Sequence, residues 1–170
     1  MRRMPIALVS AVFVILLAAS PAAAHGKPDR VVLTEPEVFQ IDGSCDFSVL
    51  GADTFAHAHI LTYSADADGT VRLNIQQIFR GTLTNAESGA SIPYVLAGHA
   101  TLQLFADGRS LLLGNGTGLT WYGAGDVAAS QLGQGIFLVS GSTSERYDAD
   151  GNLVSASAHG RIVDVCAALS

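Results

Sequence analysis

Two histidines, His57 and His59, could hold a metal ion. They lie two residues apart in an alternating segment, so both imidazoles share one face of a strand, within about 7 Å of each other. Histidine is the commonest metal ligand in proteins, and its imidazole suits zinc and copper. A structural zinc site would need two more ligands, which the sequence does not identify. The other interpretation is a pair of polar side chains on a solvent-exposed face.

A third candidate ligand is His25, which follows the run Ala22-Ala23-Ala24. Signal peptidase requires small residues before its cut, so cleavage after Ala24 would make His25 the new N-terminus. Its amine and imidazole, with a second histidine, would then resemble the copper brace of lytic polysaccharide monooxygenases and small periplasmic copper carriers. The alternative is that His25 is simply the residue after the cut. No cofactor is expected otherwise, and copper is the alternative.

Trp121 and Tyr122 are the one adjacent pair of aromatic residues in the chain. An exposed pair could stack on a sugar ring, whereas a buried pair would fill the core. This pair is therefore the candidate ligand-binding site, and the sequence leaves both interpretations open.

Catalytic residues are harder to identify. No serine or cysteine has a recognisable base, and no nucleophile motif is present. A carboxylate pair for glycoside hydrolysis remains an open alternative, because spacing in sequence says little about spacing in the fold. Asp46 and Asp164 each lie beside a cysteine, and we expect them to bond to nearby backbone or to Arg161.

The two cysteines, Cys45 and Cys166, lie near opposite ends of the chain. In an exported protein an even number of cysteines indicates disulfide bonding, and two cysteines allow only one pairing. We therefore predict a Cys45–Cys166 disulfide, with two buried free thiols as the alternative.

The first 24 residues have the three parts of a secretory signal peptide. Met1-Arg2-Arg3 is a short basic region, residues 6–19 are almost entirely apolar, and three alanines end the segment. The apolar run is shorter than the roughly 20 residues that span a bilayer, so a membrane anchor is not expected after processing. The sequence predicts a secreted, extracellular protein.

The mature chain is acidic. Removing Arg2 and Arg3 leaves seven basic against 15 acidic residues, a net charge of −8. Because the few arginines are scattered singly, nucleic-acid binding is not expected. Such a surface is compatible with a glycan or protein partner, and the oligomeric state is left open.

Apolar and polar residues alternate with a period of two along most of the chain, which indicates half-buried β-strands. Three Ala-Asp-Gly triplets, at 67–69, 106–108 and 149–151, separate these strands and favour tight hairpins. The predicted hairpins pair 57–64 with 70–84, 94–105 with 109–122, and 135–147 with 153–166. With strands at 31–34 and 45–51, the prediction is an all-β fold: an antiparallel sandwich or closed barrel of about eight strands.

The expected organisation has three parts. Residues 1–24 form the signal peptide, residues 25–44 form an N-terminal arm, and residues 45–170 form a single β domain. Residues 125–135 are expected to be a loop with one helical turn at most. The glycine-rich segment 114–118 is expected to be a bend or bulge within a strand, because no helix follows it.

Two segments resemble a group of uncharacterised exported proteins from actinobacteria. They are EPEVFQIDGSCDFSVLG at 35–51 and YDADGNLVSASAHGRIVDVCAAL at 147–169. The shared pattern is a Glu-Pro arm, Cys-Asp-Phe, then Asp-Gly-Asn-Leu and Val-Asp-x-Cys. The resemblance is clear at both ends and weak in the middle. It implies export, a bacterial source and the Cys45–Cys166 bond, and it implies no activity or catalytic residue.

Together these features favour a non-catalytic binding or structural protein outside the cell or at its envelope. A copper-binding protein, either a carrier or an oxidase that uses His25, is the first alternative. A hydrolase with an unrecognised carboxylate pair is the second.

Overall fold

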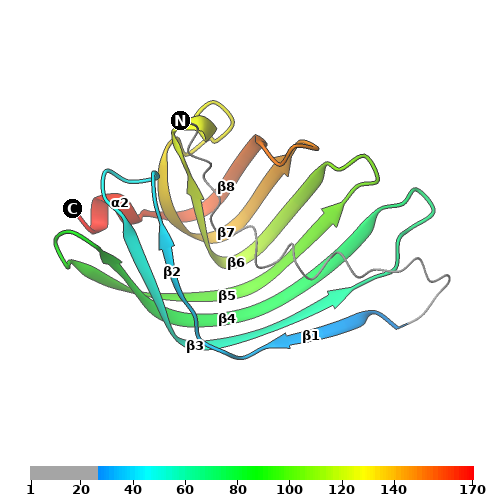
Figure 1. Ribbon diagram of the computed structural model, residues 1–170, viewed down its shortest axis with the longest axis horizontal. Helices are drawn as coiled ribbons and strands as arrows, with labels where there is room; N and C mark the ends of the chain where they lie inside the picture. Colours follow the sequence, from blue (N-terminus) through cyan, green and yellow to red (C-terminus); the bar gives the residue numbers. More distant parts are fainter. Residues whose placement is uncertain (1–26) are drawn as a thin grey trace, which may run out of the picture.

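Eight antiparallel strands form one strongly curved sheet in the computed structural model, which describes residues 27–170 (Figure 1). The all-β, antiparallel prediction is confirmed. The strands are β1 (Asp29–Leu33), β2 (Val38–Ile41), β3 (Val49–Thr62), β4 (Val71–Asn85), β5 (Ser91–Leu104), β6 (Ser110–Tyr122), β7 (Gly135–Tyr147) and β8 (Leu153–Asp164). A 3₁₀ helix, η2 (Ala124–Asp126), and a short helix, α2 (Val165–Ala168), complete the described elements. Neither is long or apolar enough to cross a membrane.

The strands follow one another around the sheet in the order β1-β3-β4-β5-β6-β7-β8. β2 also pairs with β3, so β1 and β2 share one edge of the sheet and β8 forms the other. Within residues 27–170 the two edges are not hydrogen-bonded to each other, so the barrel is open. Both edge strands β1 and β2 come from the segment expected to be an arm.

The Cys45–Cys166 disulfide joins the two edges of the sheet at one end. Cys45 lies between β2 and β3, and Cys166 lies in α2, directly after β8. Val165 and Leu169 flank it and are fully buried, and the Asn85 side chain donates a hydrogen bond to the Leu169 carbonyl. The C-terminus therefore caps one end of the open barrel.

Each Ala-Asp-Gly triplet lies in a hairpin turn, as predicted, and the hairpins β3–β4, β5–β6 and β7–β8 match the expected pairs. The turn glycines Gly69, Gly108 and Gly151 have φ values of +83°, +88° and +81°. A side chain rarely adopts this left-handed conformation, which is why glycine stands there.

A row of glycines crosses four strands and allows them to bend. Gly98, Gly116, Gly141 and Gly160 are paired in register from β5 to β8, and we call them the glycine row. A Cβ at any of them would lie between 1.9 and 2.4 Å from a backbone oxygen of a neighbouring strand. Figure 1 shows β6, β7 and β8 bending sharply in their middle. Glycine is thus required for close approach of backbones at the bend.

The bend separates two apolar clusters. The larger includes Leu83, Tyr94, Ile136 and the C-terminal Leu169, so β6–β7 residues beyond the bend pack over β4 and β5. The smaller lies on the other side of the bent strands and is formed by Tyr122, Phe137, Val139, Ala156 and Ala158. The bent strands β6 and β7 are therefore covered on one face by the larger cluster and on the other face by the smaller one.

Three details differ from the sequence-based expectations. The expected strands at 45–51 and 57–64 both overlap one long strand, β3 (Val49–Thr62), and the short strand β2 was not predicted. The last strand ends at Asp164 and not at Cys166, because the Asp164 carboxylate accepts a hydrogen bond from the Ala167 N–H and caps α2. Residues 1–26, including the expected cleavage site and His25, lie outside the described residues.

Candidate functional site

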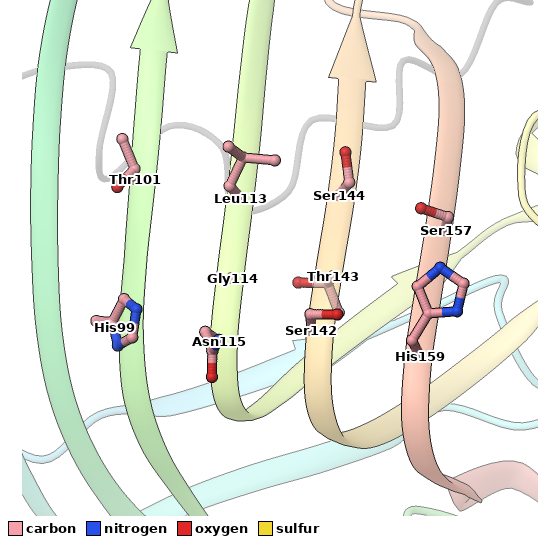
Figure 2. Close-up of a pocket in the computed structure, with 10 residues that line it drawn as sticks. All are labelled: His99, Thr101, Leu113, Gly114, Asn115, Ser142, Thr143, Ser144, Ser157 and His159. Atoms are coloured by element: carbon pink, nitrogen blue, oxygen red, sulfur yellow. The ribbon is translucent and has the colours of Figure 1, made fainter.

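Six polar side chains form one row across the curved sheet. Paired residues of antiparallel strands lie on the same face, so the register places one row residue on each strand from β3 to β8. We call this set the polar row: His59, Gln76, His99, Asn115, Ser142 and His159. All six are exposed or half-buried. Figure 2 shows the last four in line across four strands.

The polar row lies opposite the larger apolar cluster on β4 and β5, and opposite the smaller one on β8. Along β8, Ala156 and Ala158 are buried in the smaller cluster, whereas His159 is exposed. The glycine row is adjacent in sequence to the polar row, since Gly98, Gly116, Gly141 and Gly160 each neighbour one of its residues. The bend therefore runs directly beside the polar row.

Two hollows lie along the polar row and share His99. The first has a volume of about 350 Å³ and extends from β5 to β8. It is lined by His99, Thr101, Leu113, Gly114, Asn115, Ser142, Thr143, Ser144, Ser157 and His159. The second, of about 470 Å³, extends from β3 to β5. It is lined by His57, His59, Gln76, Gln77, Ile78, Ala97, Gly98 and His99. Together they form one polar groove.

The lining of the groove carries no carboxylate, ammonium or guanidinium among the described residues. Its polar groups are hydroxyls, carboxamides and imidazoles, each of which can donate or accept hydrogen bonds. In a chain with a net charge of −6, such an uncharged surface is chemically distinct. It suits a neutral ligand rich in hydrogen-bonding groups.

At one end of the groove, His57 and His59 lie on one face, as the sequence predicts, and their Nε2 atoms are 2.7 Å apart. Nη2 of Arg30, in β1, lies 2.6 Å from Nδ1 of His59. Because a guanidinium only donates, Nδ1 of His59 must accept. Neutral His59 then carries its proton on Nε2 and donates it to Nε2 of His57. The chain of bonds is complete only when both rings are neutral.

The His59 contacts predict a pH-dependent stability. Partial desolvation, the Arg30 charge and His57 all lower the pKa of His59 below its usual value. The unfolded chain then takes up a proton before the folded chain does, so the folded state loses stability as the pH falls from about 7.5 to below 6.5. We expect the melting temperature to fall over this range, and His59→Gln to reduce the fall.

A matched control is His159→Gln, which removes an exposed imidazole from the other end of the polar row. It should leave the pH dependence of the melting temperature close to that of the native chain. An equal slope for His59→Gln and the native protein would contradict the assignment.

Trp121 and Tyr122 do not form a joint platform. Trp121 is 43% exposed, whereas Tyr122 is 2% exposed and lies in the smaller apolar cluster. Successive residues of a strand point to opposite faces, which explains the separation. Trp121 alone remains available to a ligand, and it lies outside the residues that line the groove.

The buried Tyr122 belongs to a hydroxyl cluster around one carboxylate. Glu145, 7% exposed, accepts hydrogen bonds from Thr120, Tyr122 and Tyr147. Burial and the Glu145 charge raise the pKa of both phenols, so they remain donors at neutral pH. Three hydroxyls therefore satisfy the buried carboxylate of Glu145, and they tie β6 to β7.

Three other acidic residues have local structural partners. Asp164 caps α2, and Asp68 and Asp148 accept backbone N–H bonds within their own hairpin turns. Within residues 27–170, no group of three or more His, Cys, Asp or Glu side chains is arranged to hold a metal ion. The His57–His59 pair is thus a two-ligand arrangement.

No protein-family model matches the chain, and no similar curated protein or solved structure was found. Family membership therefore supplies no function, and the resemblance to exported actinobacterial proteins stays a prediction.

The sequence did not reveal the polar row. Its residues come from six strands, and only the register between strands aligns them. The glycines beside His99, Asn115, Ser142 and His159 are a visible signal, because each row residue from β5 to β8 has a glycine neighbour.

Proposed function

We propose that this protein is a non-catalytic binding protein that acts outside the cell or at its envelope. Its ligand is a neutral, hydroxyl-rich molecule of the glycan class, held in the groove along the polar row. The observation that carries the proposal is a groove lined across six strands by uncharged hydrogen-bonding side chains.

The chemistry of the lining supports a glycan. Carboxamides and imidazoles both donate and accept, as sugar hydroxyls do, so several bonds can form without burying a charge. Ile78 and Leu113 border the two hollows and offer apolar contacts to the C–H faces of a sugar. The acidic chain would repel acidic polymers, which favours neutral ones.

The extracellular location rests on two features. The predicted signal peptide would direct export, and a disulfide persists mainly in oxidising compartments outside the cytoplasm. An open barrel whose two edges are joined by a disulfide is also suited to a binding or structural role at the envelope.

The proposal predicts binding to neutral polysaccharides through the groove. In a pull-down with insoluble cellulose, mannan and chitin, the native protein should bind at least one, and an acidic polysaccharide such as pectate should not be bound. The double variant His99→Ala/Asn115→Ala removes hydrogen-bonding groups from the middle of the polar row. It should weaken binding on the order of tenfold or more.

The matched control is Gln131→Ala, in the exposed loop that pairs with β8, because Gln131 is not among the residues that line the groove. It should bind like the native protein. Equal binding by the double variant would place the ligand elsewhere, and no binding to any neutral polysaccharide would refute the proposal.

Copper binding is a second candidate, favoured by the 2.7 Å separation of the His57 and His59 Nε2 atoms. Two imidazoles on one strand can chelate Cu(II) once the bond between them opens. In a Cu(II) titration followed by electron paramagnetic resonance, His57→Ala and His59→Ala should each lose the nitrogen-coordinated signal, whereas His159→Ala should keep it. Retention of the signal by all three variants would exclude this pair as the site.

A further inference from the structure

Resting on the proposed function, we infer that the ligand is an extended linear chain of neutral sugars that runs across the strands. Each sugar lies over one strand. From β4 to β8 it meets one hydrogen-bonding residue of the polar row, whereas His59 on β3 is already bonded to Arg30 and His57. The ligand would thus be a polysaccharide segment, and the groove a series of subsites from β3 to β8.

The spacing of the polar row supports a linear chain. Neighbouring strands lie about 4.8 Å apart, so six row residues span roughly 24 Å. An extended chain of β-1,4-linked hexoses advances by nearly the same distance with each sugar. Successive sugars can therefore meet successive strands without losing register.

A second line of side chains beside the polar row also runs across the strands. The register places Asn74, Thr101, Leu113, Ser144 and Ser157 in a second line beside the polar row. Figure 2 shows the four of them from β5 to β8 parallel to the first line. Each subsite from β4 to β8 thus has a second side chain beside the row residue, and four of the five are polar.

The two hollows make the groove long enough for such a chain. They meet at His99, so the groove extends from His59 at one end to His159 at the other. Among the lining residues that the structure describes, no charged side chain lies between them. A compact ligand would fill a single hollow, and it would not depend on both ends of the polar row.

Oligosaccharide length separates these possibilities. Isothermal titration calorimetry would use the disaccharides and hexasaccharides of β-1,4-glucan, β-1,4-mannan and β-1,4-linked N-acetylglucosamine with the full mature chain. For at least one series, the hexasaccharide should bind on the order of 100-fold more tightly than the disaccharide, because added sugars reach added subsites.

Variants in the two hollows, on either side of the shared His99, test the length of the bound chain. For the bound hexasaccharide, Gln76→Ala and His159→Ala should each weaken binding several-fold, and Gln131→Ala should not. If the hexasaccharide and disaccharide bind equally, or if only one end matters, the linear chain is overturned while the glycan-binding function stands. If no sugar of any length binds and the polysaccharide pull-down is also negative, both are overturned.

Discussion

Loss of the Cys45–Cys166 disulfide is expected to lower the free energy of unfolding by about 5 kcal/mol, according to the chain-entropy model. The bond links residues 121 positions apart, so its removal frees almost the whole folded chain in the unfolded state. Urea denaturation of the native protein and of the double variant Cys45→Ser/Cys166→Ser would measure the change.

A reducing agent serves as the control, since it should destabilise the native protein and leave the double variant unchanged. Removing the bond should also loosen the structure near the cysteines before it affects the rest of the fold. Because the bond joins the two edges of the sheet, hydrogen exchange should accelerate first in β2, β8 and α2, and last in β4. If the free energy of unfolding fell by less than about 1 kcal/mol, the packing of the C-terminal segment would be enough to hold the two sheet edges together without the disulfide.

The second large effect is expected for Gly141→Ala, at the bend of β7. Gly141 has a φ of +157°, and a Cβ there would lie 1.9 Å from the His159 carbonyl oxygen. The backbones of β7 and β8 would have to separate, which should cost about 3 kcal/mol or more. Thermal or urea denaturation would show the loss, and the variant could fail to fold.

Gly118→Ala is the matched control for this prediction. Gly118 also lies within a strand, yet a Cβ there would have no atom within 4 Å, and its φ is outside the left-handed range. The substitution should be neutral or stabilising by up to about 1 kcal/mol, because alanine restricts the unfolded chain. Equal effects of the two substitutions would contradict the view that the glycine row forms the bend.

Much of the fold was predictable because its signals are local. Alternation along each strand and the three Ala-Asp-Gly turns indicated the hairpins β3–β4, β5–β6 and β7–β8. The disulfide followed from having only two cysteines. The open barrel was not predictable, because whether β8 meets β1 depends on curvature, which no single segment encodes.

The candidate site was harder to predict from the sequence, because its contacts depend on how strands pair and not on one local segment. His57 and His59 could be placed on one face because they belong to one strand. The contact of His59 with Arg30 could not be predicted, because it depends on the pairing of β1 with β3. The opposite environments of Trp121 and Tyr122 follow from strand alternation, but only the fold shows which side is buried.

The most direct test of the account is to map the ligand by nuclear magnetic resonance. A ¹⁵N-labelled sample would be titrated with whichever of the three hexasaccharides calorimetry identifies. Binding along the polar row predicts that the largest chemical-shift changes fall on Gln76, His99, Asn115 and Ser142, in one line across the strands. Changes confined to Trp121 and the loop before β7, or no changes with any hexasaccharide, would contradict it.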